Sequence, residues 1–261
     1  MKIPFSKYHG TGNDFIIIDN RILQWNPRKE EVASLCDRHF GIGGDGLMLL
    51  SERPGFDFHM KYYNSDGNES TMCGNGGRCM IIFARSLGLG GNDTRFIAID
   101  GEHHGNVVMQ SSSEIVRLKM GDVNVDEIEN DHFFLNTGSP HYVIFLQNVE
   151  SLDIVTSAKK IRFNDRFFKE GTNVDFVEQR DEKIFVRTYE RGVEDETLSC
   201  GTGVTASALA FALKKPGRGS LINVQTRGGD LSVSFNKQGN SFSDIWLEGP
   251  VKFVFKGEVD I

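Results

Sequence analysis

Two stretches of the sequence share a cysteine followed by small and polar residues. They read Cys73-Gly-Asn-Gly-Gly-Arg and Cys200-Gly-Thr-Gly-Val-Thr, and an apolar run follows each of them. This pattern predicts a cysteine at the N-terminus of a helix in both places. The first N–H groups of a helix have no intrahelical partner and lie at the positive end of the helix dipole, so they bind anions. The same field favours a thiolate over a thiol.

Two such thiols predict a reaction if they act on one ligand. One thiolate removes a proton from the carbon next to a carboxylate, and a thiol on the opposite face returns a proton, which inverts the stereocentre. Backbone N–H groups at the two helix starts would hold the carboxylate and stabilise the carbanion. These N–H groups belong to Gly74, Asn75, Gly201 and Thr202. The scheme requires no cofactor and no metal.

The elements before the two cysteines occur in the same order. A strand, a glycine turn and a second strand open the chain and come again from residue 133, and each set is followed by a helix, two strands and a polar turn. Asn13 is expected at a strand edge in the first turn, and Asn64 at the end of the strand that leads to Cys73. The order predicts a duplication with two similar domains. Their helix starts would face each other across a cleft, which is a favoured place for a small ligand.

Composition narrows the class of protein. The 261 residues carry 29 Lys and Arg against 36 Asp and Glu. The resulting net charge of -7 does not favour binding to nucleic acid or to an anionic membrane. No segment approaches the roughly 18 apolar residues of a membrane-spanning helix, and the first residues lack the apolar run of a signal peptide. Four cysteines are too few for a disulfide scaffold in a chain of this length. We therefore expect a cytoplasmic protein with reduced thiols.

Two local predictions concern residues away from the main cysteines. Helical spacing over Glu30–His39 places Cys36 on an apolar face, so we expect this thiol in the core. Gly101-Glu-His-His fits a hairpin turn, in which His103 and His104 would be exposed to solvent.

Several motifs together resemble one known family. They are His9-Gly-Thr-Gly-Asn-Asp-Phe, Met72-Cys-Gly-Asn-Gly-Gly-Arg-Cys after Asn64, Gly171-Thr-Asn-Val-Asp-Phe, and Tyr189-Glu-Arg-Gly before Cys200-Gly-Thr-Gly. The combination is similar to diaminopimelate epimerases and covers essentially the whole chain. The resemblance implies a PLP-independent homodimeric enzyme that interconverts LL- and meso-diaminopimelate, in the synthesis of lysine and of the peptidoglycan precursor.

The resemblance also implies the fold. It is an α/β (α+β) fold of two pseudo-symmetric domains, each a mostly antiparallel sheet wrapped around a central helix, with the active site in the cleft between them. The expected N-terminal domain is 1–120 together with a returning C-terminal strand, 250–261. The expected C-terminal domain is 121–249.

Site residues follow from the resemblance by position. Cys73 and Cys200 match the two catalytic thiols, and His141 matches a histidine that tunes them together with Glu190. The residues that match substrate-binding positions are Asn13, Asn64, Gly74, Asn75, Asn173, Glu190, Arg191, Gly201 and Thr202. The guanidinium of Arg191 can bind a second carboxylate with two hydrogen bonds, as a substrate with an amino-acid group at each end requires.

Three positions depart from the pattern of the family. Ser139 stands before Pro-His where many relatives have Asn, Gly46 stands where several have Gln, and the segment 192–197 is one residue longer and more acidic. These departures concern contacts to the distal end of the substrate and leave the cysteine pair intact.

Two other readings of the cysteine motifs are open. A racemase of proline or hydroxyproline would share both motifs but would not need an arginine for a second amino-acid end. A redox switch or metal site in a binding protein is the other alternative. Cys73 and Cys79 are six residues apart, which differs from the closer spacing of zinc knuckles, and no cluster of histidines completes a set of four ligands.

Overall fold

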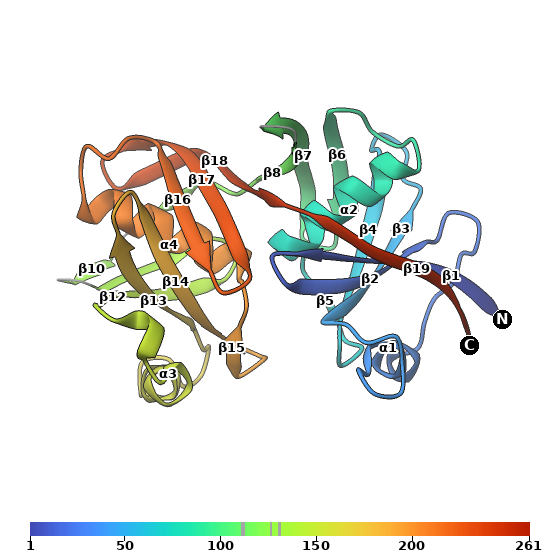
Figure 1. Ribbon diagram of the computed structural model, residues 1–261, viewed down its shortest axis with the longest axis horizontal. Coiled ribbons are helices and arrows are strands. Elements are labelled where there is room, and N and C mark those ends of the chain that lie inside the picture. Colours follow the sequence, from blue (N-terminus) through green and yellow to red (C-terminus); the bar gives the residue numbers. More distant parts are fainter. Residues whose placement is uncertain (111–112, 126, 130–131) are drawn as a thin grey trace. The chain divides into compact units, whose positions relative to one another are not determined.

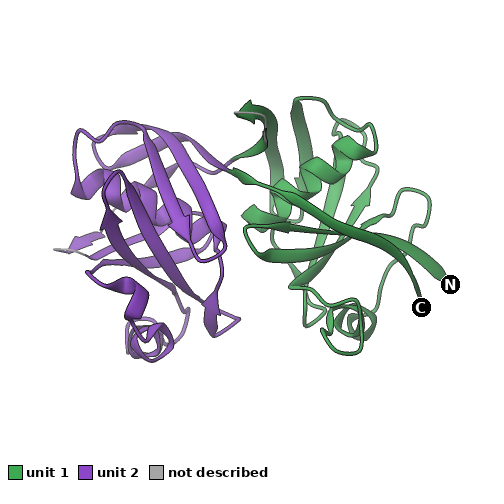
Figure 2. Cartoon of the chain, viewed as in Figure 1, with its two compact units in different colours: residues 1–118, 249–261 green, residues 119–248 purple. Residues whose placement is uncertain are grey.

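The chain forms two compact units in the computed structural model, which describes residues 1–110, 113–125, 127–129 and 132–261. Unit 1 consists of residues 1–118 and 249–261, and unit 2 of residues 119–248 (Figure 2). Unit 2 is thus a continuous segment inserted before the last strand of unit 1.

Unit 1 is a mixed sheet with two helices (Figure 1). Its elements are β1 (Lys2–Gly10), β2 (Asn13–Asp19), α1 (Lys29–Cys36), β3 (Gly46–Ser51), β4 (Phe58–Asn64), β5 (Glu69–Ser70), α2 (Gly74–Ser86), β6 (Asp93–Ala98), β7 (Gly101–Gln110), β8 (Ser113–Lys119) and β19 (Lys252–Asp260). Neighbouring strands pair antiparallel, except that β2 and β3 are parallel and so are β4 and β6. Strand β19 pairs antiparallel with β1.

Unit 2 repeats this arrangement element by element. Its elements are β9 (Val123–Asn124), β10 (Glu127–Glu129), β11 (His132–Asn136), β12 (Pro140–Phe145), the 3-10 helix η1 (Val149–Ser151), α3 (Ile154–Arg162), β13 (Asn173–Arg180), β14 (Lys183–Glu190), β15 (Asp195–Thr197), α4 (Gly201–Lys214), β16 (Leu221–Thr226), β17 (Gly229–Gln238) and β18 (Ser241–Pro250). Strands β12 and β13 are parallel, as are β14 and β16, and the other pairs in the series β11 to β18 are antiparallel.

The predicted duplication and fold class are confirmed by this correspondence. Each element from β1 to β8 has its counterpart ten strands, or two helices, later in the chain, and the two parallel pairings fall at matching places in both units. The sheets are mostly antiparallel, as expected, and the parallel pairs are those joined across α1, α2, α3 or α4.

Helices α2 and α4 are the central helices of their units. Helix α2 packs against β1, β2, β3 and β7, and α4 packs against β11, β12, β13, β14, β16 and β17. A helix enclosed by strands must be apolar on every face. The sequence of α4 satisfies this requirement, because all nine residues from Val204 to Ala212 are buried and seven of them are apolar. The residue before each of these helices is a cysteine.

The local predictions had different outcomes. Cys36 is 3% exposed in the core of unit 1, as expected, although α1 ends at this residue rather than at His39. The predicted turn at residues 101–104 is wrong, because these residues begin β7 and pair with β6. His103 is not solvated as predicted: its ring stacks on Phe96 with 5.2 Å between centroids.

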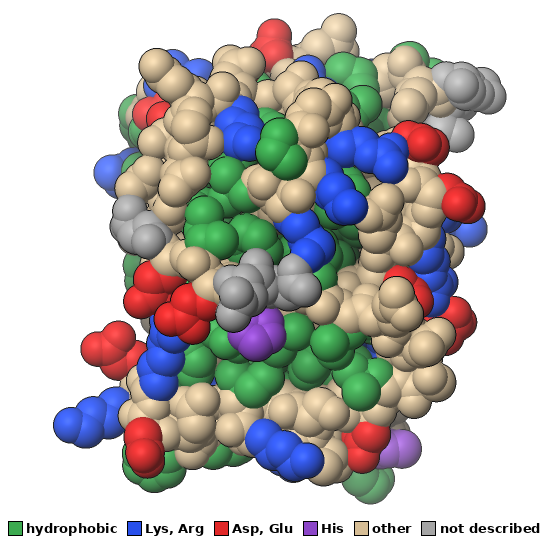
Figure 3. Space-filling model, turned by 90° about the vertical axis from the view of Figure 1, so that its left-hand side faces the viewer, with side chains coloured by type: hydrophobic (Ala, Val, Ile, Leu, Met, Phe, Trp, Pro, Cys, Tyr) green, Lys and Arg blue, Asp and Glu red, His purple; other side chains and the backbone are tan. Residues whose placement is uncertain are grey.

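The outer surface of unit 2 is mixed in character. On the side shown in Figure 3, side chains of Lys and Arg alternate with those of Asp and Glu around hydrophobic patches, and neither charge dominates. Among the described residues, none of the helices has both the length and the apolar composition that crossing a membrane requires.

Candidate active site at two helix N-termini

Both cysteines occupy the position just before a central helix, as the sequence predicts. Cys73 precedes α2 with φ −91° and ψ 132°, and Cys200 precedes α4 with φ −112° and ψ 117°. The first N–H groups of a helix have no partner within the helix, so the first turns of α2 and α4 are both suited to bind an anion.

Amide side chains surround the thiol in unit 1. The Sγ atom of Cys73 lies 3.6 Å from Oδ1 of Asn13, and Nδ2 of Asn75 donates to the same oxygen at 3.3 Å. On its other side, Nδ2 of Asn13 donates to Oδ2 of Asp45 at 2.6 Å. This carboxylate fixes the orientation of the Asn13 amide, because only the NH₂ group can face it. The oxygen of Asn13 must then face Cys73.

A buried arginine ends this chain of amides. Arg78 is fully buried on α2, and its Nη2 donates to Oδ1 of Asn75 at 2.9 Å. Its Nη1 lies 3.4 Å from the carbonyl of Gly74, and its Nε has no partner among the described residues. Burial lowers the pKa of Arg78 to about 10, against the opposing effect of Cys79 and Cys73. The guanidinium is still charged at neutral pH, and no ion pair with a carboxylate is found for it in the described part of the chain.

Hydroxyl, imidazole and carboxylate groups surround the thiol in unit 2. The Sγ atom of Cys200 is 3.3 Å from Oγ1 of Thr202, and this hydroxyl is 2.9 Å from Nε2 of His141. Nδ1 of His141 is 2.7 Å from Oδ2 of Asp175. The other oxygen of Asp175 accepts a hydrogen bond of 2.6 Å from the hydroxyl of Thr188. The side chains of His141 and Asp175 are both completely buried.

Asn173 joins this chain to the predicted distal site. Its Oδ1 accepts from the backbone N–H of Arg191 at 2.8 Å, and its Nδ2 donates to Oγ of Ser139 at 2.9 Å and lies 3.2 Å from Nε2 of His141. The guanidinium of Arg191 donates to the carbonyl of Glu170 at 2.7 Å and lies 3.5 Å from the Ser139 hydroxyl. Ser139, Asn173 and Arg191 thus form one polar cluster.

The electrostatic surroundings of the cysteines differ. Burial raises the pKa of Cys200 well above its usual value, and the charges of Glu190 and Asp175 raise it further, while hydrogen bonds with the Thr202 hydroxyl and the Gly203 N–H lower it. Burial raises the pKa of Cys36 to about 12 and that of Cys79 also rises. The thiols of Cys36 and Cys79 are therefore inert at neutral pH.

Two of the predicted residues end matching strands. Asn64 is the last residue of β4 and Glu190 the last of β14, so they occupy equivalent places in the two units. Asn64 pairs with Gly46 in the sheet, next to Asp45. The described contacts bring Asn13, Cys73 and Asn75 together in unit 1, and they bring His141, Asn173, Arg191, Cys200 and Thr202 together in unit 2.

Two glycines are explained by close packing. A Cβ atom on Gly203 would come within 2.5 Å of Oδ1 of Asp175, so the second glycine of the Cys200 motif lets α4 approach the carboxylate. A Cβ atom on Gly46, where several relatives have Gln, would come within 2.5 Å of the Tyr62 ring. In this chain position 46 therefore contributes no side chain to the site.

Three residues of the site were missed by the sequence analysis: Asp45, Arg78 and Asp175. For Asp175 the signal was present, because it stands two residues after Asn173 in a buried strand and so shares its face. An acidic residue inside an otherwise apolar strand needs a partner. The partner, His141, comes from a strand more than thirty residues earlier, and this pairing is not visible in any local pattern.

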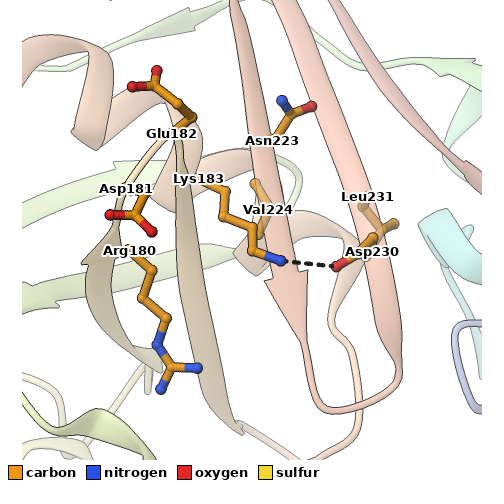
Figure 4. A pocket seen from close by; sticks show the side chains of 8 residues that line it. All are labelled: Arg180, Asp181, Glu182, Lys183, Asn223, Val224, Asp230 and Leu231. Carbon is orange, nitrogen blue, oxygen red and sulfur yellow. Dashed lines mark ion pairs between the residues drawn. The ribbon is translucent and has the colours of Figure 1, made fainter.

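A hollow elsewhere in unit 2 is lined by a different set of residues from those around the two cysteines. It has a volume of about 550 Å³ and lies where the start of β14 pairs with the parallel strand β16 (Figure 4). Its lining is Arg180, Asp181, Glu182, Lys183, Asn223, Val224, Asp230 and Leu231. The closest charged pair, Lys183 and Asp230, is 4.0 Å apart and largely exposed. None of the described residues that line this hollow is a cysteine or a histidine.

Solved structures share the fold of the whole chain. A PhzF-family phenazine biosynthesis protein of Bacillus anthracis matches with a TM-score of 0.75 at 16% identity, covering 100% of both chains. A probable proline racemase of Agrobacterium radiobacter matches with a TM-score of 0.71 at 16% identity, over 99% of this chain and 93% of that one. The chain thus has the two-unit fold found in PhzF-like proteins and in racemases of this kind.

Sequence comparison gives the family. The family model for diaminopimelate epimerase matches residues 5–125 and 133–254. A diaminopimelate epimerase of Flavobacterium psychrophilum is 50% identical over 253 residues, covering 96% of this chain and 97% of the relative. One of Chlorobaculum tepidum is 42% identical over 261 residues, covering 97% and 99%. The chain belongs to the diaminopimelate epimerase family.

Proposed function

We propose that the protein is an isomerase that interconverts LL- and meso-2,6-diaminopimelate by a two-base reaction, with Cys73 and Cys200 as the bases. The observation that carries this proposal is the presence of two thiols, each just before the first turn of a central helix. Membership of the diaminopimelate epimerase family is the reason for proposing diaminopimelate as the substrate. The place of the reaction in the synthesis of lysine and of the peptidoglycan precursor follows from that substrate.

Each face of the reacting carbon is served by one thiol in this scheme. A thiolate takes the α-proton, and the carbanion that forms spreads its charge into the adjacent carboxylate. N–H groups of Gly74, Asn75, Gly201 and Thr202 stabilise this charge. The second thiol then donates a proton on the opposite face. The scheme requires that both sulfur atoms reach the same carbon, and it needs no PLP.

The other end of the substrate needs its own polar site. Asn173 and Arg191 form such a cluster with Ser139, and Arg191 would bind the distal carboxylate. Ser139 stands where many relatives have Asn. Its oxygen accepts from Asn173, so its own O–H remains able to donate to a carboxylate. Asn13, Asn64 and Glu190 complete the proposed contacts to the reacting end.

A competing racemase reaction on proline is less well supported. The matched racemase structure is only 16% identical in sequence, so the match shows a shared fold and does not indicate a shared substrate. A cyclic substrate with one carboxylate would leave the charge of Arg191 without a partner in the bound state. We further propose that the enzyme works as a homodimer in the cytoplasm, where glutathione keeps both thiols reduced.

Incubation of the purified protein with LL-diaminopimelate in deuterated water, without added PLP, tests the assignment. The expected product is meso-diaminopimelate that carries deuterium at the inverted α-carbon. L-Proline under the same conditions serves as the control and should exchange no α-proton. If proline is racemised and diaminopimelate is not, the assignment is wrong.

A further inference from the structure

The buried groups beside Cys200 form one continuous chain of hydrogen bonds. It runs from Sγ of Cys200 to Oγ1 of Thr202 over 3.3 Å, on to Nε2 of His141 over 2.9 Å, and from Nδ1 to Oδ2 of Asp175 over 2.7 Å. Four elements contribute, because α4 carries Cys200 and Thr202 at its start, β12 carries His141, β13 carries Asp175, and β14 carries the Thr188 that holds Asp175.

The directions of the hydrogen bonds at His141 can be assigned. A carboxylate only accepts, so Nδ1 of His141 must carry the proton that Asp175 receives. Asn173 has its oxygen on the N–H of Arg191, so its NH₂ group faces Nε2 of His141. A neighbouring donor requires that Nε2 is an acceptor. His141 therefore carries a proton on Nδ1 and accepts at Nε2, where the Asn173 amide and the Thr202 hydroxyl both lie within hydrogen-bonding distance.

We propose that Thr202, His141 and Asp175 form a proton relay for Cys200, in which Asp175 is a positioning residue that fixes the tautomer of His141. The inference deepens the proposed epimerase function and rests on it for the role of Cys200. Both oxygens of the Asp175 carboxylate bond to buried side chains, to His141 and to Thr188, and they are shielded from solvent. No other group of the site therefore requires a carboxylate at position 175.

The relay moves one proton in each direction. When Cys200 must act as base, its S–H bond breaks and its proton passes to Oγ1 of Thr202, while the proton of Thr202 passes to Nε2 of His141. The electron pair of the S–H bond stays on sulfur as a thiolate. The imidazolium that forms lies against the carboxylate of Asp175. When Cys200 has given its proton to the substrate, the reverse transfer restores the thiol.

The charges around the relay explain why Cys200 needs it. Glu190 at the end of β14 and Asp175 both act on Cys200 and, together with burial, raise its pKa. Arg191 follows Glu190, but its guanidinium is turned to Glu170 and Ser139. A buried thiol among carboxylates does not ionise by itself at neutral pH, whereas transfer to an imidazole in contact with a carboxylate keeps the charges paired.

Gly203 supports the same interpretation. A Cβ atom at this position would come within 2.5 Å of Oδ1 of Asp175, 3.0 Å of Oγ1 of Thr188 and 3.2 Å of Cε1 of His141. The first turn of α4 is thus packed directly onto the Asp–His pair, with no room for a side chain between them. This close approach brings the Thr202 hydroxyl within reach of Nε2.

Alkylation of Cys200 tests the relay without any turnover. The probe is iodoacetamide at pH 7, with the rates at Cys200 and Cys73 followed separately by peptide mass spectrometry. In Asp175→Asn the amide can donate to Nδ1 and so favours the wrong tautomer. We expect alkylation of Cys200 to slow at least roughly tenfold, since a wrong tautomer in a comparable Asp–His pair costs more than that in activity. The rate at Cys73 should stay within about twofold.

Matched variants separate the relay from a general loosening of the fold. Asp100→Asn alters another Asp–His pair, that of Asp100 with His103 at 3.1 Å, and should leave the rate at Cys200 unchanged. Thr202→Val should slow Cys200 and Thr202→Ser should restore it, which also keeps the test decisive if Asp175→Asn does not fold. A wild-type rate at Cys200 in Thr202→Val, or equal slowing of both cysteines in Asp175→Asn, would overturn the relay.

Kinetics with diaminopimelate distinguish this inference from the proposed function. Asp175 touches no substrate in the proposal, so Asp175→Asn should lower kcat with little change in KM and alter the pH profile of kcat. If the wild-type protein does not epimerise diaminopimelate but the alkylation pattern holds, the relay stands and the substrate assignment fails. If the wild-type enzyme is active and the alkylation pattern is absent, only the relay fails.

Discussion

The two units place the same scaffold around their cysteines and different chemistry in contact with them. Cys73 contacts the amide of Asn13, to which the amide of Asn75 donates, and neither amide can ionise. Cys200 faces a hydroxyl that leads to His141 and Asp175, both of which can. The duplicated fold thus places a cysteine before a helix in both units, whereas the side chains that contact the two thiols differ between the units.

The position five residues after each cysteine shows the same divergence. In unit 1 it is Arg78, whose Nη1 lies 3.4 Å from the carbonyl of Gly74. In unit 2 it is Thr205, whose hydroxyl donates to the matching carbonyl of Gly201 at 2.9 Å. A fixed positive charge lies beneath one helix start and a neutral hydroxyl beneath the other. Unit 1 thus has a guanidinium at a position where unit 2 has a hydroxyl.

Removing either reactive thiol should have the largest effect. Cys73→Ala and Cys200→Ala should each lower epimerisation by roughly 1,000-fold, because each takes away the acid or base for one face of the substrate. Conversion of LL- to meso-diaminopimelate, followed by chiral chromatography, measures the loss. Cys36→Ala removes a buried thiol of the core and should keep its activity. A single variant at either site with near-normal turnover in both directions contradicts the two-base scheme.

The two buried arginines should differ in their effect on stability. Arg187 is paired bidentately with Glu196, with both N–O distances 2.6 Å, and it donates to three carbonyls of the η1 region. Arg187→Met leaves the half-buried carboxylate of Glu196 paired only with Arg227, so we expect a loss of about 3 kcal/mol in the free energy of unfolding. Urea denaturation measures it.

An exposed pair and the arginine of unit 1 serve as controls for that loss. Arg218→Met breaks a surface pair with Glu182 and should cost less than about 1 kcal/mol. Arg78→Met removes a buried charge that has no carboxylate partner among the described residues, so it should cost less than Arg187→Met. Equal losses for all three variants would show that burial of Arg187 contributes nothing beyond that of a surface ion pair.

Asp14 should make unit 1 sensitive to acid. It is the second residue of β2, as His141 is of β12. Burial would raise its pKa, but hydrogen bonds and charge from Arg38 and Lys7 outweigh this and lower the pKa to about 2. A carboxyl group with a lowered pKa stabilises the fold above its usual pKa near 4, and this stabilisation is lost as the pH falls toward 2.

The variant Asp14→Asn tests this contribution. It should lower the free energy of unfolding by about 1 to 2 kcal/mol at pH 6, a value reduced by the partial exposure of the pair, and by almost nothing at pH 2. Urea denaturation of the variant and of the wild type across this range gives the difference. A difference that does not change with pH would mean that the ion pairs of Asp14 do not stabilise the fold.

The smallest effect is expected for Arg78 on the reactivity of Cys73. Its charge acts on Cys73, and it orients Asn75 through the bond to Oδ1. Arg78→Met should slow alkylation of Cys73 by iodoacetamide about threefold to tenfold and leave Cys200 unaffected. Arg85→Met, an exposed change on the same helix, is the control. Faster alkylation of Cys73 in Arg78→Met would reverse the assignment of a countercharge.

The sequence predicts well what depends on local pattern. The positions of Cys73 and Cys200 before helices, the duplication and the core placement of Cys36 all follow from glycine turns, apolar runs and the order of elements. Asp45, Arg78 and Asp175 were missed because their roles arise from contacts with residues distant in the chain or from burial inside a closed unit. The error at residues 101–104 has a similar cause, since pairing with β6 overrides the turn tendency of Gly101.

The pairing of β19 with β1 has a consequence for the order in which the protein is built. Strand β1 lies between β2 and β19, and aromatic contacts of Phe5 with Phe255 and of Tyr8 with Phe253 join it to β19. Unit 2 is complete as a segment once residue 248 has been synthesised. Unit 1 begins first on the ribosome but is closed last, and until β19 emerges the edge of β1 remains open to other strands.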